Sequence, residues 1–218
     1  MGTAATLTAA QRRALAGLTR AGLLGDVYLA GGVAVAHYMG HRRSNDLDLF
    51  SIDEDLDLDE VRRRVVQSLG AETVSQSDAT LKLRLSGAMV DIVRYPYRAL
   101  GRTVRGPEGV RVAALRDLAV MKLAAIAKRG VRRDYWDLHE IVSRTRLTLR
   151  ATCDDYVRKF GVAETDLYHV LRALSWFEDA EADPTLPRGL TRRSWLEIRA
   201  WFEHSSAREL LRRSGSQG

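Results

Sequence analysis

The pattern of hydrophobic and polar residues changes about halfway along the chain. Before residue 112, short apolar or alternating runs predict strands, with segments of helical spacing between them. The segments Asp46–Ser51 and Thr80–Leu85 alternate strictly, as half-buried strands do. After residue 113 the spacing is helical throughout. We therefore expect an α+β lobe over residues 1–112, followed by an α-helical lobe over residues 113–218.

The same pattern predicts the individual elements. Thr80–Leu85 and Ala88–Arg94 are expected to pair as a hairpin. Residues 95–109 contain two prolines and are expected to form a loop. Further strands are predicted at residues 26–30, 46–51 and 110–112. Helices are predicted at residues 9–24, 33–38, 57–69, 115–128, 133–143, 150–160, 165–181 and 191–212. A linker is expected at residues 183–189 and disorder in the tail from Ser214.

Length and composition exclude several classes of protein. The chain of 218 residues is long enough to bury a large core. Its single cysteine, Cys153, excludes a disulfide framework and a cysteine zinc cluster, and we expect it to be inert. No apolar stretch approaches the ~18 residues of a membrane span, and residues 1–10 do not resemble a secretory signal. We expect a soluble, cytoplasmic protein with no membrane partner.

Charge is unevenly distributed along the chain. The formal net charge is +6, and a basic protein attracts nucleic acid and other anions. Residues 46–60 hold eight acidic residues and no basic ones, whereas residues 101–150 hold twelve basic and five acidic ones. This contrast fits a metal site that takes an anionic substrate. It fits two ordinary solvated faces equally well.

Three carboxylates fall on predicted strands. Asp46 and Asp48 are two residues apart, so their side chains project from the same face of a strand. Asp91 lies between apolar neighbours, where a lone charge is costly unless it is paired or bound to a metal. Mg²⁺ takes such oxygen ligands and is usually shared with substrate phosphates, and a two-ion site is an alternative. A solvated strand, or an ion pair of Asp91 with Lys82 or Arg84, would also explain the pattern.

A glycine pair precedes these carboxylates. Gly31 and Gly32 lie between a predicted strand and a predicted helix. Backbone amides at the start of a helix can hold phosphate oxygens when no side chain obstructs them. The glycine pair, the Asp-x-Asp strand and the later strand aspartate together indicate a nucleotide site.

The order of these residues resembles the first motif of AbiEii/AbiGii-type nucleotidyltransferases. These are toxins of abortive-infection toxin–antitoxin systems, built on the DNA polymerase β-like fold. The first block comprises Gly31-Gly32, His37, Gly40-His41-Arg42-Arg43-Ser44 and Asp46-Leu47-Asp48-Leu49-Phe50. The second comprises Asp117, Lys122, Ile126, Arg129, Arg133-Asp134 and Asp137-Leu138. The resemblance covers about residues 28–142.

The resemblance implies a fold and a reaction. The first lobe would be a mixed sheet with flanking helices. The enzyme would use Mg²⁺ to move a nucleotide from an NTP to an acceptor hydroxyl, most plausibly on RNA and at a tRNA 3′ end. A cognate antitoxin is a further expected partner, and readout of a DNA sequence is not expected.

The resemblance also implies roles for individual residues. Asp46 and Asp48 would be metal ligands, with Asp91 as the third. Lys122 would bind the nucleotide phosphates, and Asp134, with Asp137, would complete the site from the helical lobe. Gly31, Gly32, Arg43 and Ser44 would help to bind the nucleotide. The wider superfamily has Gly-Ser where this chain has Gly31-Gly32, and Ser44 is a candidate to supply the missing hydroxyl.

Structural alternatives remain for several of these residues. Lys122 lies in an apolar helical run, from which it could reach phosphates or extend to the surface. Asp134 and Asp137 stand near a helix start, where the dipole favours carboxylates. Arg42 and Arg43 fit either substrate contact or surface positions, and His37 and His41 fit core or surface positions better. The aromatic residues of the helical lobe are expected in the core: Tyr135, Trp136, Trp176, Trp195 and Trp201.

Two rival functions remain open at this point. One is a nucleotidyltransferase that modifies a small molecule or a protein. The other is a non-catalytic binding protein on the same scaffold. The basic span at residues 101–150 favours a polyanionic acceptor over a small molecule.

Overall fold

The computed structural model describes residues 7–25 and 27–215 and divides the chain into two compact units, Met1–Leu118 and Ala119–Gly218. Helix α4 (Leu115–Arg129) begins in the first unit and continues in the second. The predicted strand residue Asp26 and the last tail residues, 216–218, lie outside the described residues.

The first unit is built on a mixed seven-stranded sheet with the order β3-β4-β5-β2-β1-β7-β6. β2 runs parallel to β5 and β1 runs parallel to β7, and the other neighbours are antiparallel. The strands are β1 (Tyr28–Ala30), β2 (Asp46–Ser51), β3 (Glu72–Gln76), β4 (Thr80–Leu85), β5 (Ala88–Arg94), β6 (Val104–Arg105) and β7 (Arg111–Val112).

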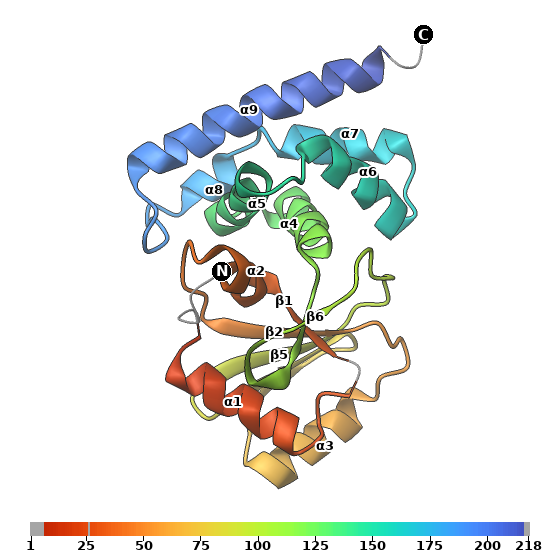
Figure 1. Ribbon diagram of the computed structural model, residues 1–218, viewed down its shortest axis with the longest axis vertical. Helices are drawn as coiled ribbons and strands as arrows, with labels where there is room; N and C mark the ends of the chain where they lie inside the picture. The colour runs from red at the N-terminus through yellow and green to blue at the C-terminus, as the bar shows by residue number, and fades with distance from the viewer. Residues whose placement is uncertain (1–6, 26, 216–218) are drawn as a thin grey trace. The chain divides into compact units, whose positions relative to one another are not determined.

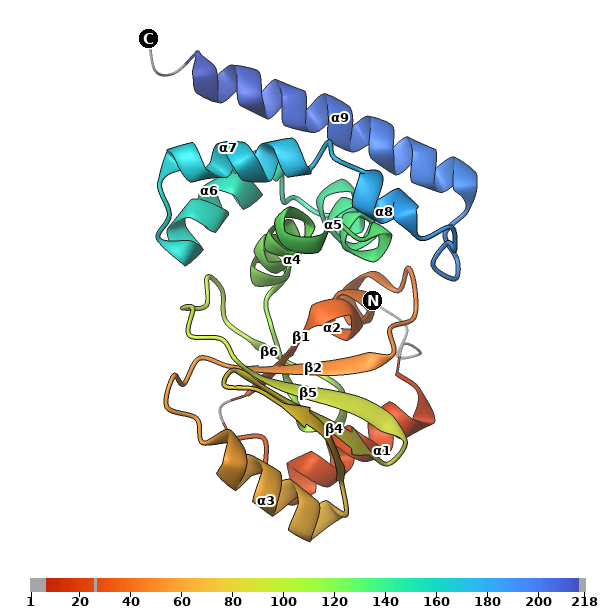
Figure 2. The same cartoon turned by 180° about the vertical axis from the view of Figure 1, so that it is seen from behind.

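Helices cover both faces of this sheet. Helices α1 (Ala9–Arg20) and α3 (Leu58–Leu69) lie on one face, and α2 (Gly31–Met39) lies on the other (Figures 1 and 2). Alternate residues of β2 and β5, such as Leu47 and Val90, are fully buried. The residues between them, including Asp48, project from the opposite face of the sheet.

The second unit contains the rest of α4 and the helices that follow it. These are α5 (Arg132–Arg144), α6 (Leu149–Phe160), α7 (Glu164–Ala173), α8 (Glu178–Ala182) and α9 (Arg192–Ser214). Its aromatic core centres on Tyr135, whose ring lies 5.2 Å from Phe177 and from Phe202, and 5.8 Å from Trp195, between centroids. These contacts join α5 to the segment before α8 and to α9.

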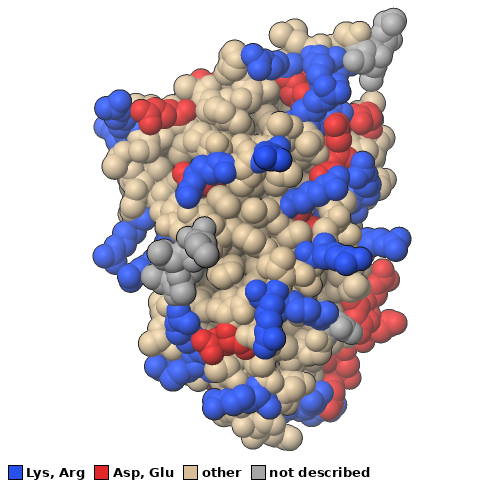
Figure 3. Space-filling view, in the orientation of Figure 1, with Lys and Arg blue, Asp and Glu red and all other residues tan. Residues whose placement is uncertain are grey.

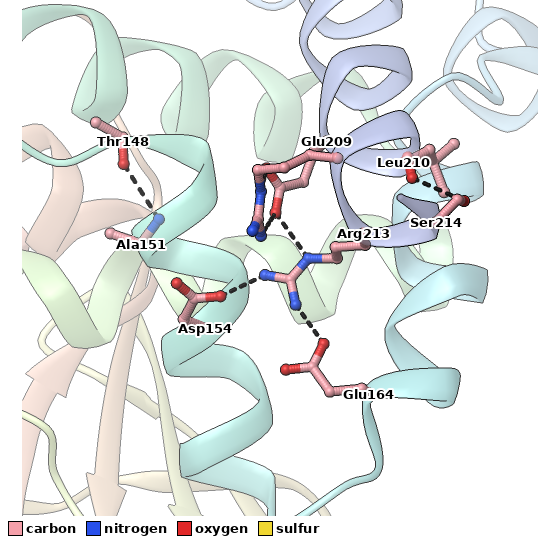
Figure 4. A network of polar contacts seen from close by, with 9 residues as sticks. Thr148, Ala151, Asp154, Glu164, Glu209, Leu210, Arg213 and Ser214 are labelled. Carbon is pink, nitrogen blue, oxygen red and sulfur yellow. Dashed lines mark hydrogen bonds and ion pairs between the residues drawn. The ribbon is translucent and has the colours of Figure 1, made fainter. Parts of the chain in front are cut away.

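A charged network fixes the end of α9 (Figure 4). The guanidinium of Arg213 pairs with Asp154 on α6, with Glu164 on α7 and with Glu209 on its own helix. Burial would raise the pKa of Glu209, but hydrogen bonds from Arg212 and Arg213 outweigh it and lower that pKa. One arginine therefore ties three helices of this unit together.

The structure confirms the predicted strands at 46–51, 80–85 and 88–94 at those bounds. It adds β3, in which every residue is exposed, and β6 within the predicted loop. The helix predicted at 165–181 is wrong as a continuous element, because α7 ends at Ala173 and α8 begins at Glu178. The hydroxyl of Tyr135 reaches the carbonyl oxygens of Ala173 and Trp176 at the break.

Along the described part of the chain, no helix has both the length and the apolar character required to span a membrane. Figure 3 shows where charge gathers on one face. In the first unit, Asp and Glu side chains line the edge at which Figure 1 places the segment between β2 and α3. Lys and Arg are spread more widely over the same face.

Candidate active site

The sheet of the first unit brings three predicted carboxylates together. Asp46 and Asp48 alternate with buried leucines along β2 and therefore share one face. In the parallel pairing of β2 with β5, Asp48 stands directly opposite Asp91. Neighbouring strands lie about 4.8 Å apart, so Asp48 and Asp91 are adjacent. The structure thus gathers Asp46, Asp48 and Asp91 on one face of two central strands.

A lysine on the next strand completes this row. Lys82 on β4 is the register partner of Asp91, and its ammonium forms an ion pair with the Asp91 carboxylate. That hydrogen bond raises the pKa of Lys82, and the charges of Asp91, Asp48 and Asp46 act in the same direction. The ion pair considered as an alternative for Asp91 is therefore present. It offsets part of the repulsion among the three carboxylates.

The donor set suits Mg²⁺ without forming a closed metal cage. Within residues 7–25 and 27–215, no three His, Cys, Asp or Glu side chains are arranged to hold a metal ion. Magnesium commonly uses only one or two protein carboxylates and takes its other ligands from water and substrate phosphates. Asp46 and Asp48 meet that requirement, whereas Lys82 already engages Asp91. The three metal-ligand assignments remain predictions.

Gly31 places the start of α2 against Asp48. Its backbone has φ +61°, and a β-carbon there would lie 1.9 Å from the Oδ2 atom of Asp48. Only glycine permits this approach at this backbone conformation. The N-cap residue of the helix, Ala30, makes no side-chain capping bond. The first amides of α2 therefore lie beside a carboxylate of the site without a side chain capping them, as phosphate binding requires.

Gly32 allows two polar side chains to approach the same helix turn. A β-carbon there would lie 2.5 Å from a guanidinium nitrogen of Arg42 and 2.6 Å from the Ser44 hydroxyl. Ser44 therefore stands beside the glycine pair, where the predicted substitute hydroxyl is required. Arg42 is buried beside Gly32, whereas Arg43 is exposed. The Arg43 carbonyl accepts a hydrogen bond from Arg42, so Arg42 is the arginine that contacts the glycine turn.

Gln11, which the sequence analysis did not select, positions this loop. Its side chain is 1% exposed on α1, and its amide nitrogen donates to the carbonyl oxygens of Ser44 and Asn45 at 2.9 and 2.8 Å. Its amide oxygen accepts from the backbone of Thr8 at 2.8 Å, as part of a capping box. The Thr-x-x-Gln spacing was the available sequence signal. That spacing predicts the helix cap, but it does not predict the hydrogen bonds from Gln11 to a loop 33 residues away.

The predicted residues of the second unit form a buried ionic cluster. Lys122 is 6% exposed, and its ammonium lies 2.8 Å from Asp134 Oδ1 and 2.7 Å from Asp137 Oδ2. Arg129 reaches Asp134 from the exposed side, with Nε 2.8 Å from Oδ2. The alternative of a surface lysine at position 122 is therefore wrong. Two cations face two carboxylates, and the cluster is formally neutral.

Electrostatics favour the charged forms in this cluster. Burial would lower the pKa of Lys122, but the charges of Asp137 and Asp134 outweigh it and raise that pKa. Burial would raise the pKa of Asp134, but Lys122 and Arg129 together lower it. The cluster links α4 to α5 within this unit. Phosphate binding by Lys122 and a site role for Asp134 remain predictions.

Three of the five aromatic residues predicted in the core of this unit are buried, whereas Trp201 is only half-buried and Trp176 is exposed. Tyr135, Trp136 and Trp195 are buried as predicted. Trp176 is not in the core, because 54% of it is exposed. The residue lies after the end of α7, in the turn that interrupts the predicted helix. The break turns its side chain away from the packed face.

The chain is similar to known proteins both in sequence and in structure. Residues 13–204 match the family described as the AbiEii nucleotidyl transferase toxin of type IV toxin–antitoxin systems. A protein of Aquifex aeolicus (strain VF5), described as uncharacterized, is 30% identical over 175 residues, which cover 79% of this chain and 84% of that protein. Among solved structures, MenT4, a nucleotidyltransferase toxin of Mycobacterium tuberculosis H37Rv, is similar with a TM-score of 0.53 and 17% identity. That alignment covers 88% of this chain and 83% of MenT4.

These findings agree with the fold. The structural similarity supports the polymerase β-like fold, a mixed sheet with flanking helices followed by a helical region. The family match extends over nearly all of the described chain. The chain belongs to the AbiEii family of nucleotidyltransferase toxins and is a nucleotidyltransferase.

Proposed function

We propose that this enzyme uses Mg²⁺ to transfer a nucleotide from an NTP to a hydroxyl of RNA, at a tRNA 3′ end, as the toxin of a toxin–antitoxin pair. The acceptor oxygen forms a bond to the α-phosphorus while the bond to pyrophosphate breaks. The hydroxyl proton leaves to a base, for which Asp91 is the candidate. Pyrophosphate is the leaving group.

The chain's own residues act mainly by holding and orienting the reactants. Asp46 and Asp48 would hold Mg²⁺. Bound there, the ion would neutralise charge on the transferred phosphate and on the leaving group. The uncapped amides at Gly31 and Gly32, with the Ser44 hydroxyl, would bind phosphate oxygens. Arg42 would add a positive charge beside the same turn, and Arg43 and Lys122 remain candidate phosphate ligands.

The close approach of Asp48 to Gly31 is the observation that carries this proposal. The helix dipole favours a carboxylate beside a helix start, and a cation held by that carboxylate would bring a phosphate within reach of the helix amides. The fold maintains this approach through a glycine with a left-handed backbone. Carboxylate and helix amides would then share one substrate, the triphosphate.

An RNA acceptor is supported by the charge of the chain. The chain carries a net charge of +6, and its basic residues are concentrated at residues 101–150. Such a distribution favours a polyanion over a small neutral acceptor. The family description adds a toxin–antitoxin context, so a cognate antitoxin is the second proposed partner.

The test is incubation with total bacterial RNA, Mg²⁺ and each α-labelled NTP in turn. We expect label on RNA from one or two nucleotides, and none from an Asp46→Ala/Asp48→Ala variant that remains folded. Label on a protein or a small molecule instead would contradict the RNA acceptor while keeping the transferase. Absence of label on any acceptor would contradict the proposal as a whole.

A further inference from the structure

We propose that a cavity in the second unit binds one unpaired nucleotide of the RNA acceptor, with its base on Trp176 and its phosphate on neighbouring cations. This inference rests on the RNA acceptor proposed above and adds a binding site to it. The cavity measures about 580 Å³. The polar and aromatic side chains that line it are Lys128, Arg129, His169, Arg172, Ser175, Trp176 and Asp179.

Trp176 is an exposed ring on a fixed backbone. The Tyr135 hydroxyl lies 2.8 Å from the Ala173 carbonyl oxygen and 2.6 Å from that of Trp176. The neighbouring Ser175 hydroxyl hydrogen-bonds to Ser206 on α9 at 2.6 Å. The turn is therefore held on both sides while the indole remains 54% exposed. A large aromatic ring presented in this way is suited to stacking a base.

Three basic side chains line the same cavity as this ring. Lys128 and Arg129 come from the end of α4, and Arg172 comes from α7. All three are exposed, although Arg129 is also ion-paired with Asp134. Among the described residues that line the cavity, Asp179 is the only acidic one. The Arg172 guanidinium also lies 5.9 Å from the ring centre of Tyr168, a second exposed aromatic residue. The lining thus joins a stacking surface to positive charge.

This combination identifies the class of ligand. A ligand with only a phosphodiester would use the cations and leave the indole without a partner. An acidic peptide would likewise bring negative charge but no nucleobase to stack on Trp176. A single-stranded nucleotide offers both a π-face and a phosphate. Bases in a duplex are stacked on one another and cannot reach the indole. The cavity would therefore hold an unpaired part of the acceptor strand.

The experiment measures RNA binding without catalysis. A fluorescent single-stranded oligoribonucleotide is titrated with the full chain in EDTA, and anisotropy gives the Kd. We expect Trp176→Ala to raise the Kd roughly tenfold. Trp176→Phe, which keeps a ring, should stay within about twofold. Lys128→Ala and Arg172→Ala should each reduce the slope of log affinity against log salt by about 0.7.

Matched controls come from α9 of the same unit. Leu196 is an exposed apolar residue and Arg193 an exposed arginine, and neither lines the cavity. Leu196→Ala and Arg193→Ala should leave the Kd unchanged. Circular dichroism of each variant identifies any loss of folding, and Arg172→Ala tests the site independently of the indole.

The outcomes separate this proposal from the transfer reaction. If Trp176→Ala and Arg172→Ala bind RNA as the wild type does, the cavity proposal is wrong, whether or not RNA is labelled. Competition by polyglutamate as effective as competition by RNA would contradict the assigned ligand class. Weakened RNA binding in these variants, with no label on RNA in the transfer assay, would support the cavity and contradict the proposed reaction.

Discussion

At the scale of single residues, two missing β-carbons shape the candidate site. Gly31 lets the Asp48 carboxylate touch the helix start, and Gly32 lets Ser44 and Arg42 approach the next residue. A side chain at Gly31 would collide with the Asp48 side chain at a left-handed backbone, and one at Gly32 would displace the Arg42 guanidinium and the Ser44 hydroxyl. The glycines therefore determine which polar groups can converge on a phosphate, although neither contributes a side chain.

The first prediction concerns Gly31→Ala. The new methyl group would lie 1.9 Å from Asp48 Oδ2 at φ +61°, so the carboxylate and the helix start must separate. We expect the rate of nucleotide transfer to fall about 100-fold, because displacements of about 1 Å have effects of that size. Rates measured with labelled NTP and RNA test this.

Gly40→Ala is the matched control for Gly31→Ala. Gly40 ends the same helix with φ +63°, and nothing lies within 4 Å of its would-be β-carbon. Both substitutions strain a left-handed backbone by about 1–2 kcal/mol, but only Gly31→Ala displaces Asp48. Equal losses of activity in the two variants would show that backbone strain, not the carboxylate contact, is responsible.

The sequence predicts the carboxylates of the site better than their polar neighbours. Alternation along residues 46–51 placed Asp46 and Asp48 on one face, and the β2–β5 register confirms that Asp91 joins them. The period of a strand determines which face a residue takes. It does not determine loop conformation, so it could not show that Arg42, and not Arg43, approaches Gly32. Gln11 was missed because its partners are distant in sequence.

The second prediction tests Gln11 as a positioning residue. In Gln11→Glu the acceptor of the capping box is retained, but the donor to the Ser44 and Asn45 carbonyls is lost. We expect the unfolding free energy to fall by about 1–3 kcal/mol. We also expect the KM for NTP to rise, because Ser44 is no longer held beside Gly32.

The exposed Gln67 of α3 offers the same chemical change as a control. Gln67→Glu should alter neither quantity measurably. A Gln11→Glu variant that loses stability but keeps its KM for NTP would limit Gln11 to a structural role. The amide of Asn is too short to reach the Ser44 and Asn45 carbonyl oxygens from position 11. A wild-type KM for NTP in Gln11→Asn would therefore contradict the proposed role of these hydrogen bonds.

At the scale of elements, α4 and α5 are joined by a buried ionic cluster. Lys122 bonds to Asp134 and Asp137, and the pairing neutralises all three charges together with Arg129. Removing one partner of a buried pair leaves an uncompensated charge. We therefore predict that Lys122→Met lowers the unfolding free energy by about 3–5 kcal/mol in urea denaturation.

The variant Asp137→Asn distinguishes a structural role of Lys122 in the cluster from a role in binding phosphate. It also disrupts the cluster, but it leaves the ammonium in place. If Lys122 contacts a phosphate, the KM for NTP should rise in Lys122→Met. It should not rise in Asp137→Asn, which keeps the ammonium. A loss of less than about 1 kcal/mol in Lys122→Met would contradict the structural role of the cluster.

The same cluster predicts a pH dependence. The pKa of Asp134 is lower in the folded chain than in the unfolded chain, so folding favours its ionised form. Its stabilising contribution is full above the unfolded pKa of about 3.9 and is lost as the pH falls through the folded value. The stability difference between wild type and Asp134→Asn should therefore be largest above about pH 5 and should narrow on acidification.

Denaturation of both proteins at pH 6, 5, 4 and 3 measures that difference. Carboxylates outside the cluster titrate alike in the two proteins, so their contributions cancel in the comparison. A difference that stays constant or widens as the pH falls would show that ionised Asp134 does not stabilise the fold.

Elements with a strong hydrophobic pattern were predictable, and those without one were not. The strands at 80–85 and 88–94 bury every second residue and were predicted at their observed bounds. β3 buries none of its residues, so no alternation marks it, and only its pairing with β4 makes it a strand. The break between α7 and α8 depends on the distant Tyr135 hydroxyl, which no local pattern reveals.

At the scale of the whole molecule, charge should govern which acceptor is used. The chain has 34 basic and 28 acidic residues, and cations line the cavity of the second unit. Binding of a strand that contacts several cations weakens steeply with salt, with a slope of about −0.7 per phosphate for single strands. We predict that the KM for RNA rises steeply between 50 and 200 mM KCl.

The KM for NTP serves as the internal reference for this prediction. A triphosphate makes few contacts, and these lie at a helix start and buried groups that salt screens less. Its KM should therefore change much less over the same range. If both KM values were insensitive to salt, the acceptor would not be a polyanion, and a small molecule would replace RNA as the proposed substrate. If both rose in parallel, screening would act on the NTP site, and the cations of the second unit would have no separate part in selecting the acceptor.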